Sequence, residues 1–188
     1  MDNSGNLYGT TSGGGDAGCL CGTVSELTPE GQETVLYSLT SESGGQSPVS
    51  GLIADKNGNL YGTAPFPGAN GSSGMVFELA PDRTLTTLHA FGGGKDGTSP
   101  WGGLVADVKG NLYGTTLNGG AHGRGTVYKL APDGKEAILH SFNCKTDGCS
   151  PEDTLILDSA GDLYGTASDL GPGSCKGQGC GTVFKVKD

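Results

Sequence analysis

The sequence predicts an all-β protein, a β-propeller of four blades whose first and last blades are incomplete and three-stranded. Three observations support this prediction. One motif recurs four times in register, short β-forming runs lie between its copies, and no run keeps helical periodicity beyond one turn. Units of about 50 residues that each hold four short strands are typical of propeller blades.

The motif reads Asp-x-x-Gly-Asn/Asp-Leu-Tyr-Gly-Thr-Thr/Ala, and its copies begin at Asp2, Asp55, Asp107 and Asp158. The repeat length is therefore 53, then 52, then 51 residues. We interpret residues 1–188 as one propeller domain. Its four repeats are residues 2–54, 55–106, 107–157 and 158–188.

Each complete blade is expected to contain four antiparallel strands, described here for the second blade. The first, Gly51–Ala54, leads into the motif, the second is the Leu-Tyr-Gly-Thr of the motif, and the third and fourth are Gly74–Leu79 and Leu85–Phe91. These runs are rich in Val, Tyr, Thr and Phe and are bounded by Gly, Pro, Asn or Asp, as strands usually are. Gly62, which follows the motif tyrosine, predicts a close approach by a neighbouring backbone.

The Asp-x-x-Gly segments are predicted to be tight turns with Gly in the left-handed region. They resemble half of a calcium loop, but Lys109 stands where a calcium ligand would be needed. We therefore expect no metal site in these turns.

Composition excludes several classes of function. The chain carries 11 basic and 20 acidic residues, a net charge of −9, which argues against a nucleic-acid partner because phosphate binding needs clustered Lys and Arg. Apolar runs extend over only a few residues, so no membrane span is expected.

The repeated Gly-Asn-Leu-Tyr-Gly-Thr, followed by Gly-Thr-Val-Phe/Tyr and Pro-Asp-Gly, resembles the GloVer tandem repeat of secreted or surface-anchored bacterial proteins. The resemblance covers essentially the whole chain. It implies an extracellular propeller-like array and supplies no established catalytic residues.

The predicted strands begin with the second strand of the first blade and end with the third strand of the last. Two arrangements stay open: a small four-bladed ring with trimmed end blades, or a fragment or protomer that a partner completes. Open strand edges invite pairing, so a homodimer formed through these edges is one expected outcome.

Six cysteines lie in the loops between predicted strands as three local pairs. They lack the Cys-x-x-Cys spacing of zinc sites, and His89 and His140 share a packing position where the first unit has Tyr37, so we expect disulfides and neither a metal nor a cofactor. Disulfides indicate an oxidising compartment, and the expected location is extracellular or at the cell surface, although this chain shows no signal peptide. The pairs are Cys144–Cys149, Cys175–Cys180 and, with its pairing left open because the two residues are so close, Cys19–Cys21.

The loops after the second and fourth strands vary between units, whereas the other two connections do not. With the first strand innermost, both variable loops emerge on one face around the channel mouth. We call this face the loop-rich face, and it is the candidate binding surface because irregular loops on a constant scaffold commonly carry function. It comprises residues 12–21, 40–50, 65–73, 92–102, 117–124, 143–153 and 168–180.

Trp101, the sole Trp, stands where the preceding unit has Val49 and the next has Glu152. It could stack on a sugar ring or, alternatively, plug the axis of a small ring. Glu152 and Asp153 are candidate catalytic residues, because a glycoside hydrolase needs two carboxyl groups about 5–9.5 Å apart. Solvated surface carboxylates are the simpler interpretation.

Four further polar residues of the loop-rich face are candidates. Asp96, as a catalytic carboxylate, and Asp147, as a ligand-binding one, recur in an Asp-Gly-x-Ser-Pro turn that they could simply cap. His122 and Arg124 could bind an anion, or belong to an exposed turn.

The leading functional prediction is an extracellular propeller that binds a polymer through the loop-rich face, with polysaccharide as the expected partner. The alternative is a propeller glycoside hydrolase that uses a pair of loop carboxylates. A second alternative is a structural repeat of a larger adhesin.

Overall fold

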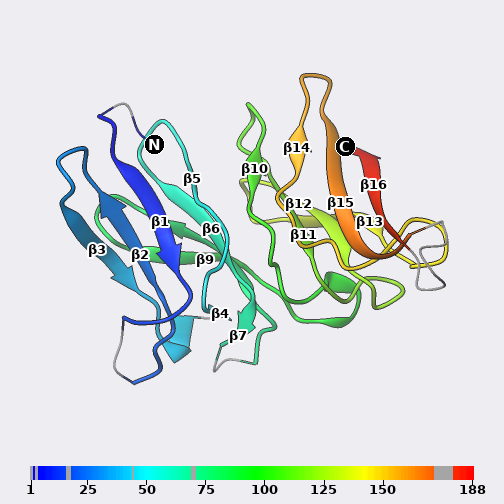
Figure 1. Ribbon diagram of the computed structural model, residues 1–188, viewed down its shortest axis with the longest axis horizontal. Helices are drawn as coiled ribbons and strands as arrows, with labels where there is room; N and C mark the ends of the chain where they lie inside the picture. Colours follow the sequence, from blue (N-terminus) through cyan, green and yellow to red (C-terminus); the bar gives the residue numbers. More distant parts are fainter. Residues whose placement is uncertain (1, 3, 16–17, 44, 69–70, 172–179) are drawn as a thin grey trace.

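The computed structural model describes residues 2, 4–15, 18–43, 45–68, 71–171 and 180–188. In these ranges the chain forms four antiparallel sheets of three, four, four and three strands and one additional two-stranded ladder. The predicted all-β, propeller-like class is confirmed. Figure 1 shows the sheets following one another from β1–β3 to β14–β16. No helix of the described residues is long and apolar enough to span a membrane.

Each of the four sheets is a meander in which strands pair with their neighbours in the sequence. The first sheet contains β1 (Leu7–Thr11), β2 (Thr23–Leu27) and β3 (Glu33–Ser38). The second contains β5 (Ile53–Ala54), β6 (Leu60–Ala64), β8 (Met75–Leu79) and β9 (Leu85–Ala90). The third contains β10 (Val105–Ala106), β11 (Leu112–Thr116), β12 (Thr126–Leu130) and β13 (Glu136–Ser141). The fourth contains β14 (Ile156–Leu157), β15 (Asp162–Gly171) and β16 (Cys180–Lys187).

Three short elements lie in the loops, where no structure was predicted. The 3-10 turns η1 (Ser41–Ser43) and η2 (Gly94–Asp96) follow the outer strands of the first and second sheets. The two-stranded ladder joins β4 (Gly45–Gln46) to β7 (Phe66–Pro67).

The Asp-x-x-Gly segments form the predicted hairpin turns, with Gly58 at φ 86°. The Asp55 carboxylate accepts hydrogen bonds from the backbone amides of Asn57 and Asn59 at 2.8 and 2.9 Å and from the Tyr61 hydroxyl at 3.2 Å. Burial opposes ionisation, but these donors outweigh it and lower the pKa of Asp55. The tyrosine contact recurs in the other three units, from Tyr8 to Asp2, Tyr113 to Asp107 and Tyr164 to Asp158.

Three hydrophobic clusters fill the spaces between consecutive sheets. Leu39 and Phe77 belong to the cluster between the first and second sheets, and Phe91 and Tyr128 to the next one. Phe142 is buried in the cluster between the third and fourth sheets. The two middle sheets are therefore covered on both faces, which is why their strands are apolar on both sides.

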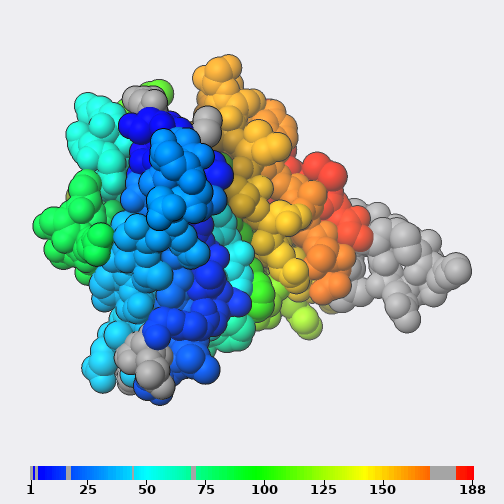
Figure 2. All heavy atoms as spheres, turned by 60° about the vertical axis from the view of Figure 1, so that its left-hand side comes forward, coloured from blue at the N-terminus to red at the C-terminus, as the bar shows by residue number. Residues whose placement is uncertain are grey.

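The first and fourth sheets each keep one face uncovered. Leu7 on β1 is 50% exposed and Val183 on β16 is 78% exposed, although both lie in strands whose other face is packed. Figure 2 shows the first sheet (blue) toward one side of the molecule and the fourth (orange and red) toward the other. The described sheets thus form an open arc in which the end sheets do not cover one another.

In the second, third and fourth units the glycine after the motif tyrosine makes room for a side chain, so the expectation of a close backbone was wrong. A Cβ at Gly62 would lie 2.7 Å from Cζ of Phe77, its partner on β8, and 2.7 Å from Cδ2 of Leu52. The aromatic ring of the third strand therefore lies over the glycine of the second, an arrangement known to support glycine in sheets.

Consecutive sheets are also tied near their inner strands by a recurring hydrogen bond. In each case the first threonine of the motif, directly after the glycine, donates its hydroxyl to a carbonyl just before the next inner strand. The pairs are Thr10 to Ser50 at 2.9 Å, Thr63 to Gly102 at 3.1 Å and Thr115 to Asp153 at 3.5 Å.

Candidate functional site

The loop-rich face lies opposite the Asp-x-x-Gly hairpins. In Figure 1 the hairpin tips point upward, whereas β4, β7 and the long loops lie at the bottom. The loop after each outer strand pairs through its backbone with the second-strand loop of the next sheet. The three equivalent pairs are Gln46 with Phe66, Thr98 with Asn118 and Cys149 with Asp169. Backbone pairing therefore fixes these loops to one another and to the sheets that carry them.

Trp101 and Phe66 meet on this face as an aromatic pair. Their ring centroids lie 5.4 Å apart in an edge-to-face arrangement. Phe66 is 43% exposed and Trp101 is half-buried, so the pair presents ring surface to solvent. Aromatic pairs prefer this geometry, which holds both rings in place. The sequence singled out Trp101, but Phe66 was missed because its only signal was one aromatic residue in a variable loop.

The local backbone fixes the position of Trp101. Ser99 adopts a left-handed conformation at φ 56°, and its amide donates to the Ser73 carbonyl at 2.8 Å. Pro100 then packs against Gly74, where a Cβ would lie 2.6 Å from Cδ of the proline. The conformation of Ser99 and Pro100 therefore fixes where Trp101 lies, at the start of the segment that leads into β10.

Glu152 and Asp153, at the equivalent place in the next unit, are both exposed. The Asp153 carboxylate accepts a hydrogen bond from the Thr166 hydroxyl at 2.7 Å. Its backbone carbonyl lies directly against Gly102, where a Cβ would be 2.5 Å from that oxygen. Gly102, which follows Trp101 in the chain, therefore contacts the backbone of Asp153. This contact places the segment with Trp101 next to the segment with Glu152 and Asp153 on the loop-rich face.

Asp96 and Asp147 each cap a turn and also pair with a histidine. Asp96 accepts from the Gly92 amide and lies 2.9 Å from Nε2 of His89. Asp147 accepts from the Asn143 amide at 3.1 Å and lies 2.6 Å from Nε2 of His140. The capping role was among the predicted alternatives. The histidine partner was missed, because its seven-residue spacing crosses from a strand into a loop.

The two histidine rings also pack as the sequence predicted. His89 lies edge-on to Phe91, with centroids 4.7 Å apart, and His140 lies edge-on to Phe142 at 4.8 Å. Each histidine ring therefore contacts a core phenylalanine on one side and a loop aspartate on the other.

His122 and Arg124 occupy an exposed segment of the loop before β12. The Arg124 carbonyl accepts the Ser150 amide at 3.1 Å, so the backbone of this loop contacts the next unit. Neither the His122 nor the Arg124 side chain forms an ion pair with another described residue.

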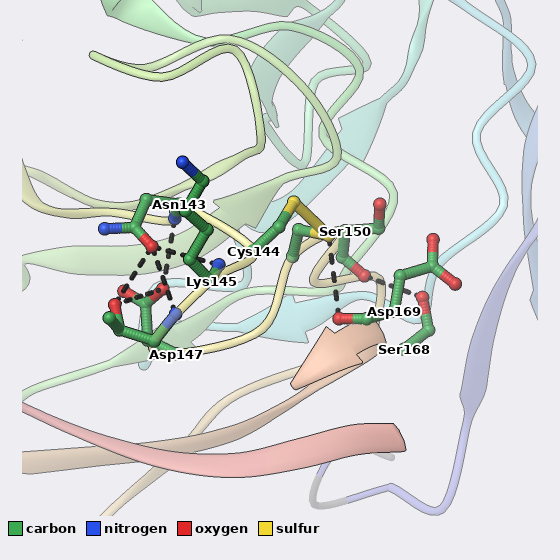
Figure 3. The surroundings of a disulfide bond; sticks show 9 residues. Asn143, Cys144, Lys145, Asp147, Ser150, Ser168 and Asp169 are labelled. Carbon is green, nitrogen blue, oxygen red and sulfur yellow. Dashed lines mark hydrogen bonds between the residues drawn. A yellow bond between two sulfur atoms is a disulfide. The ribbon is translucent and has the colours of Figure 1, made fainter. Parts of the chain in front are cut away.

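Two disulfides lie in the loops of this face. Cys144 is joined to Cys149, as predicted, and Cys19 is joined to Cys21, which the sequence left open. The backbone of Cys149 forms the bridge to Asp169. Figure 3 shows Ser150, Ser168 and Asp169 beside the Cys144–Cys149 disulfide, with the Ser168 hydroxyl donating to the Ser150 carbonyl at 3.0 Å. The predicted pair of Cys175 and Cys180 lies outside the described side chains.

A wide hollow lies away from the loop-rich face. Its volume is about 1200 Å³, and it is bounded by the inner strands β5, β10 and β14 and the hairpin tips beside them. Its apolar wall includes Val105 and Ile156, and its rim carries Asp158, Lys187 and Asp188. The sequence suggested no binding candidate on this side, because its turns are constant from unit to unit.

Four antiparallel meanders stacked face to face, with their irregular loops gathered on one face, define a propeller-like repeat protein. Within that class, the chain belongs to the Gloeobacter/Verrucomicrobia repeat family, whose model matches residues 1–188. The resemblance drawn from the recurring motif is confirmed.

Solved structures with a similar fold include a luciferin-regenerating enzyme, with 15% identity and a TM-score of 0.61 over 100% of this chain and 59% of that one. A gluconolactonase from Xanthomonas campestris has 21% identity and a TM-score of 0.52, covering 86% of this chain and 55% of its own. A second protein, a proposed gluconolactonase, has 21% identity and a TM-score of 0.50, with coverages of 86% and 56%. The chain spans little more than half the length of each, and the likeness is one of fold. A comparison with curated proteins gave no significant match.

Proposed function

We propose that this chain is an extracellular binding module that holds a carbohydrate polymer against its loop-rich face. The observation that carries the proposal is the partly exposed pair formed by Trp101 and Phe66. Flat aromatic surface suits the apolar faces of sugar rings, and rings held by packing lose little conformational freedom on binding.

The surroundings of the pair supply the polar part of such a site. Glu152 and Asp153 are exposed beside Gly102, and carboxylates accept hydrogen bonds from sugar hydroxyls. The net charge of −9 disfavours polyanions, so we propose a neutral polysaccharide as the partner.

The extracellular part of the proposal is supported by chemistry of the loops. Disulfides join both cysteine pairs whose side chains are described, and such bonds persist in oxidising compartments.

The test is co-sedimentation of the full chain with insoluble cellulose, chitin and xylan. Trp101→Ala is expected to weaken binding by at least about tenfold, as loss of one aromatic anchor does. Val49→Ala is the matched control, because Val49 holds the equivalent position and is 40% exposed, and it is expected to bind as the wild type does. Equal binding by wild type and Trp101→Ala, or binding to none of the three polymers, would contradict the proposal.

The same preparations test the hydrolase alternative. Release of reducing sugar that disappears in Glu152→Gln or Asp153→Asn would make the chain an enzyme that uses these carboxylates. Binding without release is the outcome expected of the proposed module, and neither binding nor release would favour a structural repeat.

Pairing between copies is a separate proposal, supported by the uncovered faces of the first and fourth sheets. Size-exclusion chromatography with light scattering is expected to show a dimer that Val183→Lys disrupts. A monomeric wild type would contradict this proposal and leave the binding proposal intact.

A further inference from the structure

A histidine and two carboxylates converge at the junction between the second and third sheets. His89 comes from β9, Asp96 from η2 and Glu136 from the start of β13. One potential ligand atom from each residue lies within 4.8 Å of the other two, and Nε2 of His89 is 2.9 Å from Oδ1 of Asp96. All three residues are half-buried.

Glu136 is the member of this cluster that its surroundings do not satisfy. Its Oε1 is buried and has no hydrogen-bond partner in the described part of the chain. No ion pair among the described residues brings a Lys or Arg to either carboxylate. Two adjacent, half-buried carboxylates repel one another, and this repulsion is relieved when a cation neutralises them.

The repeat supplies an internal comparison. The pair of His140 and Asp147 has the same spacing, the same Nε2 contact and the same turn-capping role, but among the described residues no third potential ligand joins it. The histidine–aspartate pair is therefore a structural feature of the unit. The presence of Glu136 beside His89 and Asp96 is what distinguishes this cluster from the pair of His140 and Asp147.

We propose that His89, Asp96 and Glu136 bind one divalent transition-metal ion, with Zn²⁺ as the ion that fits best. One imidazole nitrogen and two carboxylate oxygens form a ligand set that Zn²⁺ accepts, and three protein ligands leave a fourth position open. Two negative charges are balanced by the ion. Ligation through Nε2 requires that nitrogen to be unprotonated, so a proton held there between His89 and Asp96 would move to Nδ1 or to solvent.

Such an ion would cross-link two sheets through their outer edges. His89 and Asp96 belong to the second unit and Glu136 to the third, so binding depends on the two sheets being packed together. A ligand that binds only the folded state stabilises it, and 100-fold excess over Kd contributes about 2.7 kcal/mol. Added Zn²⁺ should accordingly raise the unfolding midpoint.

The experiment is isothermal titration of the chelator-treated full chain with ZnCl₂ at neutral pH, together with thermal unfolding with and without Zn²⁺. We expect one saturable site per chain, lost in Glu136→Gln and in His89→Gln. His140→Gln is the matched control, because it removes the equivalent histidine where no third ligand is present, and it should keep both the binding and the Zn²⁺-dependent rise in Tm.

Glu136→Gln keeps the size of the side chain and removes its charge, so it is expected to fold and to unfold at the same or a higher temperature without metal. The proposal is overturned if the wild type shows no saturable binding. It is equally overturned if Glu136→Gln binds Zn²⁺ as the wild type does, or if His140→Gln loses binding to the same extent as His89→Gln.

Discussion

Replacing Gly62 by Ala tests whether an aromatic ring truly occupies the space above the motif glycine. The new Cβ would lie 2.7 Å from both Phe77 Cζ and Leu52 Cδ2, well inside van der Waals contact, and Phe77 is fully buried. Overpacking of this kind costs about 1–3 kcal/mol, offset by about 0.4–1 kcal/mol because Ala restricts the unfolded chain. We expect the free energy of unfolding to fall by about 1–2 kcal/mol, measured by urea denaturation.

The matched control is Gly9→Ala, at the same position of the first unit. A Cβ there meets no atom within 4 Å, because Ser25 stands across from Gly9 where the second unit has Phe77. This variant should be as stable as the wild type or slightly more stable. Equal losses in the two variants would refute the reasoning, since they would trace the cost to the backbone instead of to the ring.

Three further outcomes are expected. Phe142→Ala should lower the free energy of unfolding by about 3–5 kcal/mol, because the ring is fully buried between the third and fourth sheets, whereas the exposed Val183→Ala should change it little; urea unfolding measures both. Burial opposes ionisation of Asp107, but its turn donors prevail and lower its pKa, so the stabilisation is present above its ordinary pKa of 3.8 and is lost as the pH falls through the folded-state value. Thermal unfolding at pH 5 and pH 3 should therefore show a smaller loss in Asp107→Asn than in the wild type. Replacing Cys144 and Cys149 together by Ala should lower the free energy of unfolding by about 2 kcal/mol by the loop-entropy model. A reductant should accordingly lower the Tm of this variant less than it lowers the Tm of the wild type.

The strands were predictable because the information that specifies them is local and repeated. Alternation of β-forming runs with Pro-Asp-Gly and Asp-x-x-Gly turns placed the second and third strands of all four sheets and the fourth strand of the first three. The three, four, four, three distribution followed from counting the predicted strands. The inner strands pair over only two residues, as Ile53–Ala54 shows, so the predicted Gly51–Ala54 was longer than the observed element.

The contacts between units could not be read in the same way. The backbone bridge of Thr98 with Asn118 depends on amides and carbonyls that every residue possesses, so side-chain identity gives no signal for it. Phe66 reaches Trp101 because the loop that carries Trp101 lies against the loop before β8, where the Ser99 amide donates to the Ser73 carbonyl. Glu136 joins His89 across a sheet boundary for a related reason, since stacking, and not sequence distance, makes them neighbours.

The threonine hydroxyl that ties each motif strand to the carbonyl before the next inner strand has an evolutionary consequence. Because every junction uses the same donor position, and the packed clusters each involve only two successive sheets, a gene duplication that inserts one unit would create a new junction already compatible with both of its neighbours. Copy number can therefore change without compensating substitutions elsewhere, while the variable loops of each copy diverge independently.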